Sequence, residues 1–216
     1  LPIKLNICLC SHFFYKMAFR KPHFDDAFGQ HFVSEIPDHN IPLNESKARN
    51  FLLSQNFPPG FATAFVKNAE LVPIRLFICD DSGSMNENDG NKLITTKAGA
   101  VRSVQCSRWE ELKESIAFHA ELAHESNSLT EFRFLNGPPS IVVGDFERDP
   151  DGCGLRAVRK VLDSGPSGGT PLCLHVREIT KQIQIAAERL RAANQVACIT
   201  ICTDGMCSDG DLVQAM

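Results

Sequence analysis

The chain has 216 residues, of which 43% are apolar and 22% are charged, a composition that suits one α/β domain with an extension. Its net charge of −4 and its pI near 6.0 leave no basic stripe, which argues against nucleic acid and anionic membranes as partners. No apolar run approaches the roughly 18 residues that a membrane helix needs, so no membrane span is expected.

The nine cysteines are an odd number, and several lie in apolar runs, where a thiol behaves as a small apolar side chain. This usage is typical of a reduced protein, so we expect an intracellular, cytoplasmic location. Neither the pair Cys8 and Cys10 nor the trio Cys198, Cys202 and Cys207 has the spacing or the histidines of a zinc site.

Residues 1 to 44 are predicted to form an irregular N-terminal extension. The chain opens on Leu1, and the stretch to Phe14 is too interrupted by polar residues for the core of a signal peptide. Met17 is an alternative translation start. Scattered Phe, His and Pro residues up to position 45 show no sustained period.

Residues 45 to 70 are predicted to form a short helical hairpin. Asn44 is placed to cap a first helix over 45 to 55, whose apolar stripe contains Ala48, Phe51 and Leu52. A Pro-Pro-Gly break precedes a second helix over 61 to 68. The pair faintly resembles the start of a ubiquitin-associated domain, but we expect it to pack on the main domain.

An apolar strand over 72 to 79 ends on a group of oxygen donors. The run from Ile74 to Cys79 has the composition of a strand buried on both faces of a parallel sheet. Asp80, Ser82 and Ser84 follow at alternating positions. Hard oxygen donors at the carboxyl end of a parallel strand suit Mg²⁺ or Mn²⁺, although turns or a helix cap would also explain the hydroxyls.

The middle of the chain carries a helix and a pair of strands. Residues 85 to 92 are predicted as a polar loop, and an EF-hand is excluded because Met85 and Asn91 stand where glycine and glutamate are required. Ser107 opens a capping box for a helix that extends to Ser126. Strands follow over 129 to 135 and 141 to 143, and then a short helix over 155 to 162.

Two later segments carry further oxygen donors. Thr170 follows the glycine-rich stretch 165 to 169 and precedes a helix whose apolar face begins at Leu172. Capping of this helix by Thr170 would explain the residue without a metal. An apolar strand over 196 to 202 then runs into Asp204.

Together these motifs resemble the von Willebrand factor type A (vWA, integrin I-like) domain with its metal-ion-dependent adhesion site. The resemblance covers residues 71 to 216 and rests on Asp80-x-Ser82-x-Ser84, Gly169-Thr170-Pro171-Leu172 and Thr203-Asp204-Gly205. It implies an α/β fold with a doubly wound, mostly parallel Rossmann-like sheet and an antiparallel edge hairpin at 129 to 143. It also implies a domain truncated at its C-terminus, whose strand over 196 to 202 keeps an unpaired edge.

The resemblance implies that Asp80, Ser82, Ser84, Thr170 and Asp204 hold Mg²⁺ or Mn²⁺. Two carboxylates nearly balance a divalent ion, which leaves the ion able to accept a carboxylate from an Asp or Glu of a protein partner. We therefore expect a metal-dependent protein interaction module and no enzymatic activity.

Two alternatives stay open. A phosphatase of the haloacid-dehalogenase type would need a second carboxylic acid two positions after Asp80, where this chain has Ser82. The other alternative is a metal-free scaffold that keeps only the fold. The partner's identity has no signature in the sequence.

Overall fold

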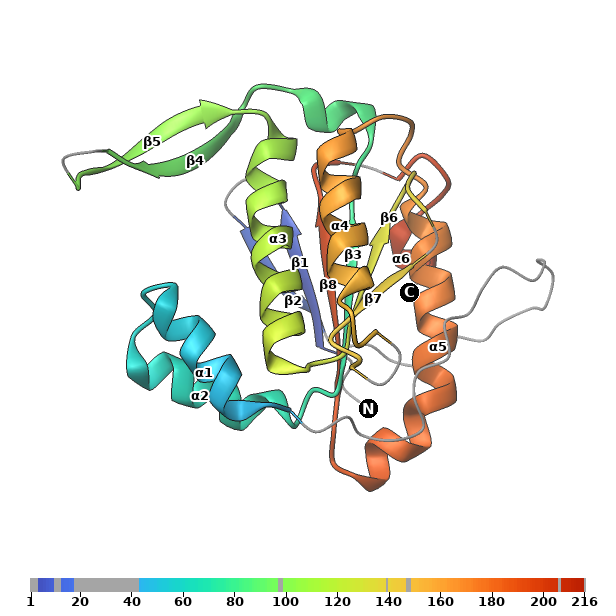
Figure 1. Cartoon of the computed structure of the whole chain (residues 1–216). Helices are drawn as coiled ribbons and strands as arrows, with labels where there is room; N and C mark the ends of the chain where they lie inside the picture. Colours follow the sequence, from blue (N-terminus) through green and yellow to red (C-terminus); the bar gives the residue numbers. More distant parts are fainter. Residues whose placement is uncertain are drawn as a thin grey trace.

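A six-stranded sheet forms the centre of the computed structural model, which describes residues 4–9, 13–17, 43–96, 99–138, 140–146, 149–205 and 207–215. The strand order is β2 (Phe13–Met17), β1 (Lys4–Leu9), β8 (Ala197–Thr203), β3 (Ile74–Cys79), β6 (Thr130–Phe134) and β7 (Ile141–Val143). The four central strands are parallel and the two edge strands are antiparallel (Figure 1). The expectation of an α/β fold with a mostly parallel sheet is confirmed.

Helices cover both faces of the sheet. Strand β3 alternates its side chains, so Leu76 and Ile78 pack toward α5 (Leu172–Ala192), whereas Phe77 packs toward α3 (Arg108–Ser126) and α4 (Cys153–Ser164). The predicted burial of β3 on both faces is therefore confirmed. The site-bearing end of β3 is held by a core on each side.

The helices α1 (Glu45–Ser54) and α2 (Pro59–Ala69) form a pair that lies against α3 (Figure 1). The Asn44 side chain accepts a hydrogen bond from the Lys47 amide at 3.0 Å and so caps α1, as its position predicts. Leu52 of α1 and Ala62 of α2 are buried together with Leu122 of α3. This contact accounts for the pair as a packing unit.

The N-terminal extension differs from the sequence-based expectation. Strand β1 pairs in parallel with β8, placing Leu5 beside Ile199 and Leu9 beside Thr203, and β2 pairs with β1. The expected unpaired edge of the strand over 196 to 202 is therefore wrong, because β1 occupies that edge. The six residues of β1 mix polar and apolar side chains, so the sequence gives only a weak indication of a strand. The strand forms here by pairing with β8. Residues 18 to 42 lie outside the described part of the chain.

A second, two-stranded sheet follows the polar turn after β3. The 3-10 helix η1 (Gly83–Asn86) leads to β4 (Gly90–Thr95), which pairs with β5 (Val101–Cys106). The predicted loop over 85 to 92 is therefore wrong from Gly90 onward. The hairpin extends away from the main body (Figure 1), and Leu93 and Val101 are 72% and 63% exposed. Because neither face of this hairpin packs on a core, its sequence shows no regular alternation of apolar and polar residues from which the strands could be predicted.

The remaining elements follow the predicted order. The capping box at Ser107 is present at the start of α3, and β7 pairs antiparallel with β6. The short helix α6 (Leu212–Ala215) packs on α5 through buried Ala215. Within the described residues, no helix combines the length and apolarity required to cross a membrane.

Candidate metal centre

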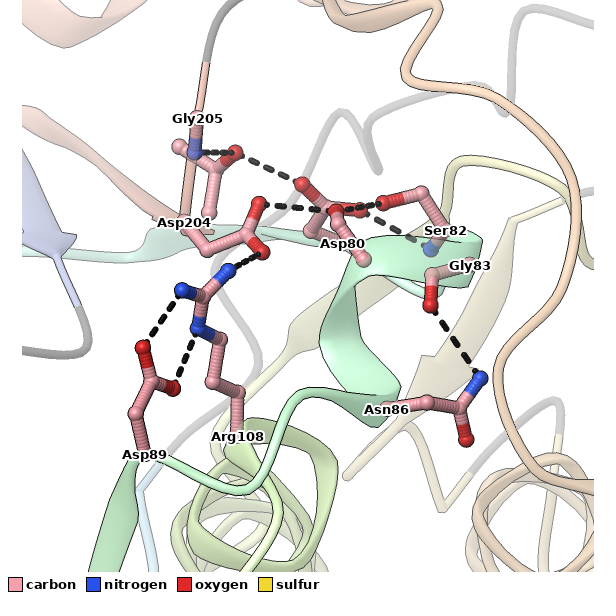
Figure 2. Close-up of polar contacts among 10 residues, drawn as sticks. Asp80, Ser82, Gly83, Asn86, Asp89, Arg108, Asp204 and Gly205 are labelled. Atoms are coloured by element: carbon pink, nitrogen blue, oxygen red, sulfur yellow. Dashed lines mark hydrogen bonds and ion pairs between the residues drawn. The ribbon is translucent and has the colours of Figure 1, made fainter.

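Asp80 and Asp204 directly follow the ends of β3 and β8, which are parallel neighbours, so the two residues lie close together. The register places Cys79 of β3 beside Cys202 of β8, and the Asp80 amide donates to the Cys202 carbonyl at 2.8 Å. Both strands end at the same edge of the sheet. Two acidic residues that are far apart in the sequence therefore share one end of the fold (Figure 2).

Asp80 is fully buried, and both of its carboxylate oxygens have partners. One oxygen accepts a hydrogen bond from the Ser82 amide at 2.9 Å, and the other accepts one from the Thr203 hydroxyl at 2.7 Å. A buried carboxylate held from two sides has a fixed orientation. Thr203 was absent from the predicted site, yet the parallel register of β3 and β8 could have indicated it.

Two serine hydroxyls connect the ends of the two strands. The Ser82 and Ser84 hydroxyl oxygens lie 3.1 Å apart, and the Ser84 hydroxyl donates to the Asp204 carboxylate at 3.2 Å. The turn at η1 folds the two hydroxyls back toward β8. Three of the five predicted ligands, Ser82, Ser84 and Asp204, are thus linked through their side-chain oxygens, and Asp80 joins them through the Ser82 amide.

Thr170, the fifth predicted ligand, lies on a loop that is seated against the same turn. The Gly83 amide donates to the Gly168 carbonyl at 3.0 Å, and the Thr170 amide donates to the Ser208 hydroxyl at 3.1 Å. Gly168 has φ of +87°, and a Cβ there would come within 2.5 Å of Asn136, so this close approach requires glycine. These contacts place the main chain of the loop against the η1 turn, and none of them joins the Thr170 hydroxyl to Ser82 or Ser84.

The alternative role of Thr170 as a helix cap is wrong. Helix α5 begins at Leu172 with Pro171 in the capping position. The Asp209 carboxylate accepts hydrogen bonds from the Cys173 amide at 3.0 Å and the Leu174 amide at 2.8 Å. Asp209 therefore caps α5 from a distant part of the chain, a contact that local sequence does not reveal.

Asp81 supports the surrounding loops. Its carboxylate accepts hydrogen bonds from the amide and the side chain of Asn136 at 2.8 and 3.1 Å. Asn136 in turn donates to the Gly169 carbonyl at 2.8 Å, directly before Thr170. Burial raises the pKa of Asp81, and the hydrogen bonds from Asn136 oppose that shift. Asp81 thus braces the loop that carries the fifth predicted ligand.

Arg108, the first residue of α3, is a second residue in contact with the candidate site that the sequence did not indicate. Its guanidinium donates to Asp204 at 2.5 Å and to both oxygens of Asp89 at 2.6 Å (Figure 2). These hydrogen bonds raise the pKa of Arg108, and the bonds from Arg108 lower the pKa of Asp89. No local pattern predicts this contact, because Arg108 and Asp204 are 96 positions apart.

A different set of ligand atoms lies beside the site. Cys173, Cys207 and Asp209 place one ligand atom each within 4.8 Å of one another. Burial, together with a hydrogen bond to Cys207, raises the pKa of the Cys173 thiol to about 12. Thiols suit soft metals rather than Mg²⁺, and Asp209 already caps α5. The oxygen-rich group at Asp80 is the better magnesium candidate.

Comparisons of the chain with protein-family models, curated proteins and solved structures find no match. Its function is therefore inferred from the geometry of the site.

Proposed function

We propose that this chain is a vWA-like, metal-dependent protein interaction module that binds a partner's Asp or Glu carboxylate through Mg²⁺ or Mn²⁺. The observation that carries the proposal is that Asp80, Ser82, Ser84 and Asp204 are joined in series by hydrogen bonds, Asp80 through the Ser82 amide and the other three through their side-chain oxygens. These donors come from the ends of two adjacent parallel strands. Ligands of open α/β sheets bind at such carboxyl ends.

The donor set fits a hard divalent cation. Asp80 and Ser82 are buried, and the Asp204 side chain is 4% exposed, so two carboxylates lie largely out of water with hydroxyls between them. Carboxylate and hydroxyl oxygens are the ligands that Mg²⁺ and Mn²⁺ favour. Ser82 and Ser84 would hold the ion directly, with Asp80, Asp204 and Thr170 contributing directly or through water. When bound, the ion would supply a coordination position for the partner's carboxylate.

The strand order supports the doubly wound, Rossmann-like part of the proposal. The connection from β3 to β6 passes through α3 on one face, and the connection to β8 passes through α5 on the other. From β3 the chain first adds β6 on one side and later adds β8 on the other. The order of strands therefore reverses between β3 and β8, beside Asp80. Such a switch point is a common place for a ligand site. Buried thiols such as Cys79 and Cys173 support a reducing, cytoplasmic location as part of the same proposal.

Calorimetric titration with Mn²⁺ tests the metal site. We expect the full chain to bind one ion, and Ser82→Ala and Ser84→Ala to weaken binding about tenfold or more, because each removes one hydroxyl ligand. Ser164→Ala is the matched control, since Ser164 is an exposed serine at the end of α4. Equal affinities for all four proteins would contradict the site.

The open coordination position is tested by the relaxation of water protons around the Mn²⁺-loaded chain. A bound ion that keeps exchangeable water enhances the relaxation rate, and acetate, as a minimal carboxylate, should lower that enhancement by replacing the water. Acetamide, which lacks the charge, serves as the control probe. An enhancement that acetate leaves unchanged would contradict carboxylate binding while leaving the metal site in place.

A further inference from the structure

Arg108 holds two carboxylates at once, and only one of them belongs to the candidate site. Its side chain is 24% exposed, Asp89 is 61% exposed and Asp204 is 4% exposed. The contact with Asp89 uses two guanidinium nitrogens on two oxygens, whereas the contact with Asp204 uses one nitrogen. Arg108 is therefore shared between a rim carboxylate and a buried one (Figure 2).

The buried carboxylate of Asp204 needs a positive charge. A carboxylate taken out of water is costly unless it is paired, and the Arg108 guanidinium provides that pairing at one oxygen of Asp204. The other oxygen accepts the Ser84 hydroxyl. A divalent ion held by Ser84 and Asp204 would supply the same positive charge from the opposite side, and it would repel the guanidinium.

We propose that Arg108 is a tethered cation that competes with the divalent ion for Asp204, so that ion binding transfers Arg108 wholly to Asp89. The inference rests on the proposed function, since it concerns the regulation of the same site. In this exchange Arg108 and Asp89, neither of which is among the five predicted ligands, help to set the affinity for the ion.

The geometry makes the exchange favourable because Arg108 keeps a partner after it leaves Asp204. Asp89 already receives a two-point contact, the arrangement in which arginine binds a carboxylate best. Asp89 and Arg108 also stand at the two ends of the β4–β5 hairpin, directly before Gly90 and shortly after Cys106. The exchange therefore links the ion to the contacts at the base of the hairpin.

The direct test is Mn²⁺ titration of the full chain and of two variants, one expected to raise the affinity for the ion and one expected to lower it. Arg108→Gln should bind Mn²⁺ about tenfold more tightly, because the competing cation is gone. Asp89→Asn should bind it several-fold more weakly, because Arg108 loses its other partner and stays on Asp204. Lys113→Gln is the control: Lys113 lies on α3, as Arg108 does, and forms an exposed ion pair with Asp163 of α4, so its loss should leave the affinity unchanged.

A double-mutant cycle separates this exchange from a general field effect of the charges. If Arg108 is the intermediary, Asp89→Asn should have no effect in the Arg108→Gln background, whereas independent charges would give additive effects. Additive effects, or an Arg108→Gln affinity equal to or below that of the unchanged chain, would overturn the exchange while leaving the metal site standing.

Two further outcomes complete the test. If Arg108→Gln does not fold, Arg108→Met replaces it, because methionine keeps a long unbranched side chain and removes the positive charge. An Arg108→Met affinity above that of the unchanged chain supports the proposal, and an affinity equal to or below it overturns the proposal. Absence of Mn²⁺ binding to the unchanged chain would instead remove the proposed function, and the exchange with it.

Discussion

The candidate site depends on a small number of atoms whose partners fix their direction. The Thr203 hydroxyl donates to one oxygen of Asp80, and the Ser82 amide donates to the other. A carboxylate in this position can face an ion only if both partners hold it in one orientation. In the proposed metal site Thr203 would be a positioning residue, although it is absent from the ligand set that the sequence predicts.

We predict that Thr203→Val weakens Mn²⁺ binding about tenfold to a hundredfold, because valine keeps the shape of threonine and removes the hydrogen bond to Asp80. Thr180→Val is the matched control: Thr180 is a buried threonine of α5 whose hydroxyl bonds the Val176 carbonyl. Calorimetry measures both variants. An affinity for Thr203→Val equal to that of the unchanged chain would show that Asp80 needs no such orientation.

His119 gives the fold a dependence on pH at the scale of one residue. Its ring lies 4.8 Å from the Phe77 ring and 5.4 Å from the Phe118 ring, centre to centre. Burial lowers the pKa of His119 from the ordinary 6.5 to about 4. Between these values the unfolded chain binds a proton that the folded chain does not, so this residue lowers stability as the pH falls through this range.

We predict that the free energy of unfolding contains a contribution from His119 that falls by roughly 2 kcal/mol from about pH 7 to about pH 5. Urea unfolding of the unchanged chain and of His119→Phe at several pH values measures it, because the difference between the two removes the titration of other groups. A difference that stays constant with pH would contradict a partly buried imidazole that is neutral in the folded chain.

At the scale of elements, burial decided which parts were predictable from sequence. Strand β3 and helix α3 present apolar side chains to a core, so their sequences show a clear apolar pattern. Ile78 of β3 and Trp109 of α3 belong to these patterns, and both are buried. The β4–β5 hairpin faces no core, and β1 is ordered by pairing with β8, so neither has such a signal. Four of the five predicted ligands could be found from the ends of apolar strands, whereas the contact of Arg108 depends on where the hairpin places the start of α3.

The start of α5 depends on a residue from another part of the chain. We predict that Asp209→Ala lowers the free energy of unfolding by about 1 kcal/mol, within a range of roughly 0.5 to 2, because two amides at the start of α5 lose their acceptor. Asp151→Ala, an exposed aspartate in the connection before α4, should change it by less than about 0.5 kcal/mol. Chemical denaturation compares them, and equal effects would contradict the capping role.

At the scale of the whole molecule, the N-terminal strands complete the sheet beside the site. Strand β1 pairs with β8 along six residue pairs, from Lys4 with Cys198 to Leu9 with Thr203. This pairing extends to the last residue before Asp204. The same strand therefore protects a sheet edge and supports the end of β8 that carries a predicted ligand.

We predict that a variant lacking residues 1 to 17 self-associates, because the loss of β1 exposes the hydrogen-bonding edge of β8. Light scattering coupled to size-exclusion chromatography, at equal concentrations of the variant and the full chain, measures the effect. A variant that stays monomeric while the full chain is also monomeric would show that this edge needs no cover.

The central claim is that two strand ends and the η1 turn hold one divalent cation. Anomalous diffraction from crystals of the full chain grown with Mn²⁺ tests it directly, since the ion's own signal locates it. The account predicts one peak within coordination distance of the Ser82 and Ser84 hydroxyl oxygens and adjacent to Asp204. A peak at Cys173, Cys207 and Asp209 instead, or no peak in crystals that contain Mn²⁺, would contradict it.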